Sequence, residues 1–158
     1  MTKPLRVGII GVSAEGGWAR EGHVPAVQGL DGLELAAVAT NSQKTADASA
    51  RAFGVAGAYG SGLDLARAPG IDLVTVATRV PDHHDLVLAA LAAGKHVYSE
   101  WPLGRDIAET EEMEAAARKA GVHVAIGLQL RGSPVVRRAR ELIASGAIEL
   151  SRYRGSAS

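Results

Sequence analysis

The chain has 158 residues, which is typical of one domain, and its 17 basic and 17 acidic residues give a formal net charge of zero. A balanced charge creates no long-range field for nucleic acid or an acidic membrane surface, and 4% aromatic residues provide few stacking platforms for single-stranded nucleic acid. The absence of cysteine excludes a disulfide framework and a thiolate site.

Short apolar runs of β type alternate with helical stretches along the chain. These runs are continuous rather than alternating, which indicates strands buried on both faces and therefore a parallel sheet. In chain order, we predict strands over residues 5–10, 33–40, 55–59, 71–78, 95–99 and 122–128.

Helical stretches fill the connections between these strands. We predict helices over 43–53, 82–93 and 106–120, each followed by a glycine, and a last helix between Pro134 and Gly146. Asp82 and Ser133 are expected to cap the helices that follow them. The pattern predicts an α/β fold, with a doubly wound, mostly parallel six-stranded Rossmann sheet and helices on both faces.

The domain organisation follows from where these elements end. We predict one domain over residues 1–146. Residues 147–158 are too few for a second domain, and 148–153 read as a lone strand that cannot bury itself. Read by themselves, they are interpreted as an edge-strand or disordered tail.

The loop after the first strand, 11–17, reads GVSAEGG and opens a helix. Helix N-terminal amides hold a dinucleotide pyrophosphate at such a place. Gly11 is expected to make the tight turn and Gly16 to permit close helix–strand packing, while Ser13 narrows the approach but offers a hydroxyl. The alternative is an ordinary glycine-rich turn. The predicted cofactor-binding residues of this segment are Gly11, Ser13, Gly16, Gly17 and Trp18.

The end of the second strand normally carries an acid that binds the ribose hydroxyls of NAD. Asn41 and Ser42 stand there instead, and Lys44 follows. No acid repels a 2′-phosphate and Lys44 attracts one, so the predicted cofactor is NAD or NADP. The other interpretation, a helix cap with a solvated lysine, is compatible with this one.

Four further segments carry a resemblance to a known family. They are VATRVPDHH at 76–84, AGKHVYSEWPL at 93–103, GLQLRGSP at 127–134 and HVPA at 23–26. In this order, they resemble the N-terminal half of the Gfo/Idh/MocA family of NAD(P)-dependent oxidoreductases, over roughly residues 5–148. The Glu-Trp-Pro variant is most similar to the branch with the galactose-regulon repressor proteins and related bacterial oxidoreductases.

The resemblance implies that residues 1–146 are a dinucleotide-binding domain and that 147–158 are the start of a C-terminal substrate domain absent from this chain. It implies a hydride transfer to or from a sugar-like substrate in the intact protein, with this chain alone inactive. It also implies a nicotinamide site built by the segments after the fourth, fifth and sixth strands. Thr78 read alone is an ordinary strand-end residue, and His84 an ordinary first-turn residue. The residues implied to bind the cofactor are Thr78, Arg79, Val80, His84, Glu100, Trp101, Pro102 and Gln129.

Trp101 departs from the family pattern, which has a lysine here that assists proton transfer. Tryptophan only donates a hydrogen bond and exchanges no proton at neutral pH. Lysine-dependent oxidation is therefore in doubt, and the sequence nominates no catalytic residue. The alternative function is a non-catalytic, dinucleotide-responsive module that binds a protein partner. A third interpretation is a domain that no longer binds nucleotide because Ser13 blocks the pyrophosphate.

The expected partners are a dinucleotide and, only with a C-terminal domain, a small carbohydrate-like substrate. We expect no nucleic acid, membrane or metal partner, and a homodimer formed through the surface that the C-terminal domain would cover. The apolar runs are far shorter than a membrane span and Met1–Arg6 precedes no apolar signal core, so we expect a cytoplasmic protein.

Overall fold

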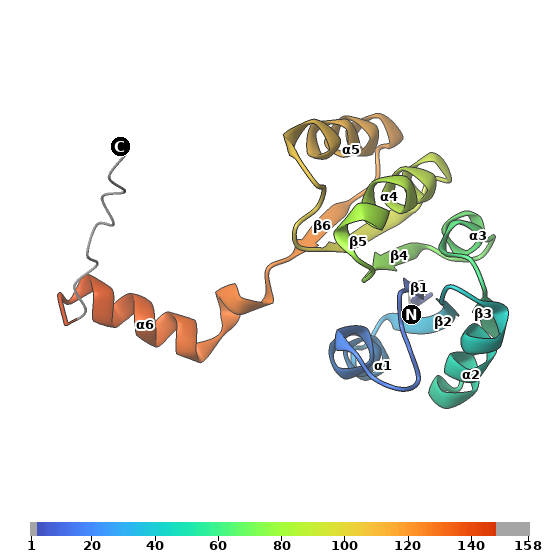
Figure 1. Ribbon diagram of the computed structural model, residues 1–158, viewed down its shortest axis with the longest axis horizontal. Helices are drawn as coiled ribbons and strands as arrows, with labels where there is room; N and C mark the ends of the chain where they lie inside the picture. The colour runs from blue at the N-terminus through green and yellow to red at the C-terminus, as the bar shows by residue number, and fades with distance from the viewer. Residues whose placement is uncertain (1–2, 148–158) are drawn as a thin grey trace, which may run out of the picture. The chain divides into compact units, whose positions relative to one another are not determined.

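The computed structural model describes residues 3–147 and contains one six-stranded sheet (Figure 1). All neighbouring strands are parallel, in the order β3-β2-β1-β4-β5-β6. This is the doubly wound order, so the predicted Rossmann sheet is confirmed. The strands are β1 Leu5–Ile10, β2 Leu33–Ala39, β3 Gly57–Tyr59, β4 Leu73–Val76, β5 His96–Glu100 and β6 Val124–Gly127.

Helices cover both faces of the sheet, as predicted (Figure 1). One face packs against α1 and α2, and the other against α3, α4 and α5. A π-helical turn precedes α1, and a 3-10 turn over Val80–Asp82 precedes α4. The helices are α1 Val24–Gly29, α2 Gln43–Phe53, α3 Gly62–Arg67, α4 His83–Ala92 and α5 Ile107–Ala120.

Two layers of apolar side chains lie on the two sides of β1. Val7 and Ile9 pack toward α1 and α2, whereas Ile10 packs toward α3 and α4. Gly8 lets α3 approach closely, because a Cβ there would lie 2.6 Å from Leu65 Cδ2. Fully burying one aliphatic side chain stabilises a fold by roughly 1.5–3 kcal/mol. These layers hold β1 rigidly, which fixes where its carboxyl end points.

The side chains that cap the helices differ in part from those predicted. Asp106 caps α5 by accepting from the Glu109 N–H at 2.9 Å. Asp82 does not cap α4 with its side chain, because its backbone is already helical at φ −91° and ψ −12°. Ser133 makes no side-chain cap hydrogen bond either, although α6 begins at Pro134. Helix α3 was not predicted, yet Ser61 caps it at the Asp64 N–H in a serine-x-x-acid pattern that marks helix starts.

The chain divides into two compact units, one ending at Gly127 and one beginning at Leu128. The second unit, within the described residues, contains a 3-10 turn over Gln129–Gly132 and the helix α6, Pro134–Ala144. The predicted boundary at residue 146 stays a prediction. The lone strand predicted over 148–153 lies outside the described residues.

Candidate functional site

A cavity of about 770 Å³ opens at the carboxyl ends of β1, β2 and β4. Strands β2 and β4 lie on opposite sides of β1, so this is the point where the strand order reverses. Ligands of doubly wound sheets bind at this point. The cavity is lined by Ile10, Gly11, Val12, Ser13, Thr40, Asn41, Ser61, Gly62, Leu63, Ala77, Thr78, Arg79, Pro81, Asp82, Asp85 and Leu86.

Gly11 makes the turn that ends β1 at the floor of this cavity. Its φ is +91°, and a Cβ there would lie 2.7 Å from the Ala77 carbonyl oxygen and 2.9 Å from Thr78 Cγ2. The Gly11 N–H donates to the Ala39 carbonyl at 2.9 Å, so the turn is tied to the end of β2. The structure therefore requires glycine here on both conformational and steric grounds.

The remainder of the loop is held by serine hydroxyls. The Ala14 N–H donates to Ser49 Oγ of α2 at 3.1 Å, and the Glu15 N–H donates to Ser13 Oγ at 3.1 Å. Gly17 begins the helical turn, because its carbonyl accepts the N–H groups of two residues in the first turn. The expectation that Gly16 permits close helix–strand packing is wrong, since a Cβ there would meet no atom within 4 Å.

Thr78 supplies the feature that fits a bound dinucleotide most directly. Its Oγ1 is buried and finds no hydrogen-bond partner among the described residues, while the residue lines the cavity beside Gly11. Leaving such a group unpaired costs roughly 1–3 kcal/mol, so a native structure keeps one mainly where a ligand or water completes it. The bare backbone at Gly11 and the unpaired hydroxyl of Thr78 together suit the phosphates and ribose of a dinucleotide.

The segment after β2 combines two of the interpretations of the sequence. Ser42 Oγ accepts from the Thr45 N–H at 3.3 Å, so Ser42 caps α2. Asn41 is exposed and lines the cavity, whereas Lys44 is exposed on the first turn of α2 and is not a lining residue. The cavity therefore meets an amide side chain, and no carboxylate, at the end of β2.

A second polar cluster surrounds Glu100, at the carboxyl end of β5. Glu100 Oε1 accepts from Trp18 Nε1 at 3.1 Å and lies 2.5 Å from His23 Nε2. The His23 ring meets the Tyr98 ring edge-on, with centroids 5.3 Å apart. Burial, and then the Glu100 carboxylate, raise the pKa of Tyr98. His23 was quoted in a family motif but not predicted as a site residue, because its partner lies 77 positions away.

His83 is the buried histidine that the sequence interpretation missed. It is 1% exposed, with Nδ1 3.0 Å from the Pro102 carbonyl oxygen and Nε2 3.1 Å from the Thr78 carbonyl oxygen. The imidazole therefore links the segment after β4 to the Glu-Trp-Pro turn after β5. Helical spacing from the buried Leu86 and Ala90 places His83 on the inner face of α4, which was the available signal.

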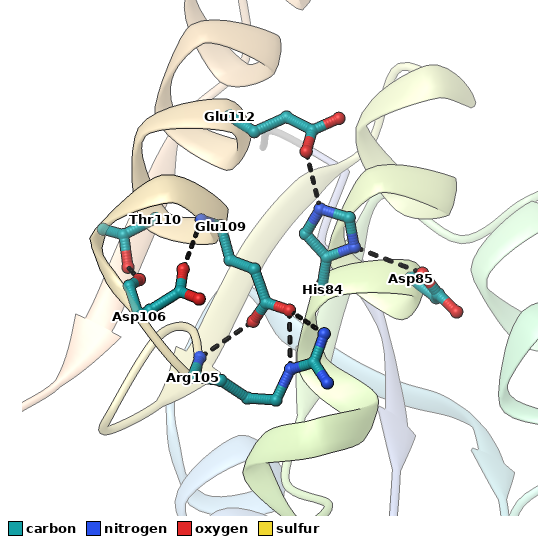
Figure 2. Close-up of polar contacts among 7 residues, drawn as sticks. All are labelled: His84, Asp85, Arg105, Asp106, Glu109, Thr110 and Glu112. Atoms are coloured by element: carbon teal, nitrogen blue, oxygen red, sulfur yellow. Dashed lines mark hydrogen bonds and ion pairs between the residues drawn. The ribbon is translucent and has the colours of Figure 1, made fainter.

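His84, the predicted cofactor residue, instead faces α5 (Figure 2). Its Nε2 lies 2.9 Å from Glu112 Oε2 and its Nδ1 3.2 Å from Asp85 Oδ1. The hydrogen bond with Glu112 is the main reason that the pKa of His84 is raised. Arg105 and Glu109 form an ion pair nearby on the same helix–helix boundary. These contacts join α4 to α5 and do not support a place for His84 beside a nicotinamide.

The remaining predicted residues have different surroundings. Arg79 lines the cavity, and Val80 begins the 3-10 turn before α4. Trp101 is 65% exposed, and the indole of Trp18 is also well exposed. Gln129 belongs to the second compact unit, which is described by itself.

Two further classes of site were sought in the described part of the chain. Between residues 3 and 147, no cluster of three or more histidine and acidic side chains is suited to hold a metal ion. Across the same residues, no helix has the length and apolar character needed to cross a membrane.

Comparisons with known proteins relate this chain to proteins with an NAD-binding Rossmann fold. Residues 5–128 match the family model described as "Oxidoreductase family, NAD-binding Rossmann fold". The chain is 34% identical over 154 residues to the dehydrogenase aclE of Aspergillus oryzae, which covers 94% of this chain and 42% of that protein. It is 31% identical over 154 residues to the galactose/lactose metabolism regulatory protein GAL80 of Saccharomyces cerevisiae, which covers 92% of this chain and 35% of that protein.

A solved structure gives the same result for the fold. The 3-ketoreductase KijD10 of Actinomadura kijaniata, in complex with TDP-benzene and NADP, superposes with a TM-score of 0.80 at 27% identity. The match covers 92% of this chain and 45% of KijD10. The chain therefore spans less than half the length of each of these three proteins.

Proposed function

Because the chain belongs to the oxidoreductase family with an NAD-binding Rossmann fold, we propose that it is the coenzyme domain of an NAD(P)-dependent oxidoreductase. The intact protein would pass a hydride between the nicotinamide and a carbohydrate-like alcohol or carbonyl. The chain spans 42% of aclE, so the proposed turnover belongs to the longer protein. This chain alone would bind coenzyme without catalysing the reaction.

The observation that carries the proposal is the pairing of Gly11 with Thr78 in the cavity. Gly11 lines the cavity and needs to be glycine because a Cβ would collide with the Ala77 carbonyl, and Thr78 holds a buried hydroxyl without a partner among the described residues. A cavity of about 770 Å³ has room for a large ligand at the site where doubly wound sheets bind dinucleotides.

The chain's own residues would share the binding of the coenzyme. The loop of residues 11–17 directs the N-terminus of the following helix toward the pyrophosphate. Asn41 would donate and accept hydrogen bonds at the adenosine ribose, and the Thr78 hydroxyl would donate to an oxygen of the coenzyme. Glu100 ends β5 in the half of the sheet that would take the nicotinamide, whose ring would supply the carbon that gives or takes the hydride.

The finer choice between NAD and NADP rests on the segment after β2. No acid stands at this strand end, so no carboxylate repels a 2′-phosphate. Lys44 is exposed one helical turn from Asn41 and adds a positive charge. We propose that the site accepts both dinucleotides.

A second candidate function is a non-catalytic regulator that responds to the dinucleotide and binds a protein partner. The observation in its favour is Trp101, whose indole stands 65% exposed where the resembling family carries a proton-transferring lysine. The 31% identity to GAL80, a regulatory protein, also supports this candidate. Both candidates require coenzyme binding and differ in whether the longer protein reduces NAD(P).

Titration calorimetry of this chain with NAD and with NADP tests the shared premise. Binding of at least one dinucleotide in the cavity is expected, together with a rise in the melting temperature. No heat and no thermal shift from either dinucleotide at millimolar concentration would contradict the proposal. Hydride transfer with a panel of sugars, measured on the longer protein with Trp101 and with Trp101→Lys, separates the enzyme from the regulator.

A further inference from the structure

The cluster around Glu100 lies in the half of the sheet that faces the nicotinamide. In a doubly wound sheet, the adenosine ribose lies at the end of β2, and the coenzyme crosses the switch point to the other half. Glu100 closes β5, which pairs with β4 on that other half. The topology therefore places this carboxylate at the carboxyl edge of the half of the sheet that takes the redox-active ring.

Two ring nitrogens hold the Glu100 carboxylate in place. Trp18 Nε1 only donates, and it donates to Glu100 Oε1 at 3.1 Å. His23 Nε2 lies 2.5 Å from the same oxygen, within hydrogen-bond distance. The Glu100 side chain is only 17% exposed, which lowers the screening of its charge by solvent.

The two redox forms of a nicotinamide coenzyme differ by one charge on the ring, which is positive when oxidised and neutral when reduced. We propose that Glu100 makes this site select the oxidised coenzyme over the reduced coenzyme. The inference rests on the proposed function and adds a property to it, because it makes occupancy of the site report the redox state of the coenzyme pool.

The other charges that line the cavity follow different strands. Arg79, Asp82 and Asp85 line the part of the cavity next to β1, β2 and β4. In the strand order these strands all lie on one side of β5, whereas Glu100 ends β5 itself. Burial raises the pKa of the neighbouring Tyr98 further above its ordinary value of 10, so this phenol carries no charge at physiological pH.

The test compares dissociation constants for NAD+ and NADH, and for NADP+ and NADPH, in this chain by calorimetry. We expect the oxidised form to bind about tenfold more tightly, as one partly screened charge pair implies. Glu100→Gln keeps an oxygen that accepts from Trp18 and should bring the ratio close to one. Glu112→Gln removes an exposed carboxylate that contacts His84 and does not line the cavity, so it should leave the ratio unchanged.

The outcomes separate the two proposals. Equal affinities in the wild-type chain, tighter binding of the reduced form, or a ratio that survives Glu100→Gln overturns the selection by Glu100 but leaves the coenzyme domain intact. Binding of neither form overturns the proposed function and this inference together. If Glu100→Gln does not fold by circular dichroism, the wild-type ratio alone decides, because a value of one is sufficient to reject the inference.

Discussion

Two histidine–glutamate contacts in this protein have similar chemistry and different surroundings. In the first pair, His23 contacts Glu100 at the carboxyl end of β5, and the two side chains are 13% and 17% exposed. The helix pair, His84 and Glu112, joins α4 to α5, and its glutamate is 61% exposed. An exposed pair is screened by water and contributes little to stability, whereas the charge of the less exposed carboxylate at the strand end is screened less and is the one we propose to act on the coenzyme. Position in the fold, rather than residue type, separates a binding site from a surface contact.

Gly11→Ala, at the carboxyl end of β1, is expected to have the largest effect of the substitutions near the binding site. The new Cβ meets the Ala77 carbonyl oxygen at 2.7 Å and the backbone has a positive φ, so we expect a loss of about 3 kcal/mol in the free energy of unfolding. Dinucleotide binding should be abolished. Urea unfolding and calorimetry provide the measurements.

Gly94→Ala is the matched control for that substitution. Gly94 has a similar φ of +70°, but a Cβ there meets no atom within 4 Å. It should lose only about 1 kcal/mol, from backbone strain, and keep its coenzyme affinity. Equal losses in the two variants would show that the close approach at Gly11 has no special role.

His83→Phe is expected to have a smaller effect. His84→Phe, which changes the next residue on a different side of α4, is the variant for comparison. The His83 substitution keeps a ring but removes both ring nitrogens, one near each of the Thr78 and Pro102 carbonyls, and so the buried hydrogen bond that an imidazole N–H donates there; it should cost about 2 kcal/mol. The His84 substitution removes exposed contacts and should cost about 0.5 kcal/mol. Urea denaturation measures both free energies of unfolding. A larger loss from His84→Phe than from His83→Phe would contradict this prediction.

Thr78→Val is expected to separate binding from stability. The hydroxyl is buried without a partner among the described residues, so its removal should leave the free energy of unfolding unchanged or slightly higher. Coenzyme affinity should fall about fivefold, as for one lost hydrogen bond of about 1 kcal/mol. Unchanged affinity by calorimetry would mean that the Thr78 hydroxyl does not meet the coenzyme.

The smallest effect concerns the pH dependence of the helix pair. Glu112 raises the pKa of His84 in the folded protein above its ordinary value of 6.5. Its stabilisation is therefore fully present below that value and is lost as pH rises through the folded pKa. The wild type should exceed His84→Gln in stability by about 0.5 kcal/mol near pH 5.5, and by almost nothing near pH 9. A gap that widens with rising pH, in urea melts, would contradict this assignment.

Much of the scaffold was predictable because its signals are local. The continuous apolar runs predicted a parallel sheet, and α2 occupies the range that was expected. Gly11 was correctly placed in the tight turn, because a strand followed by glycine at a helix start has few conformations open to it. The helix α3 was missed although Ser61 and Asp64 carry a local signal for its start.

Contacts between distant segments were beyond local reasoning. The assumed packing role of Gly16 failed because the helix after the loop leaves open space at that position. Between two adjacent histidines, the sequence interpretation selected His84 for the site, but the inward face of α4 carries His83. Spacing along one helix indicates an inner face, while the carbonyl groups that meet it come from two other segments.

The sequence by itself determined the alternation of buried strands and helices, the glycine turn after β1 and the membership of an NAD-binding family, because each depends on neighbouring residues or on an ordered set of motifs. Only the tertiary structure decided that Trp18 and His23 hold Glu100, and that His83 rather than His84 joins the two segments beside the site. Such partners lie as many as 82 positions apart, so only the packing of the sheet and its helices brings them within hydrogen-bond distance.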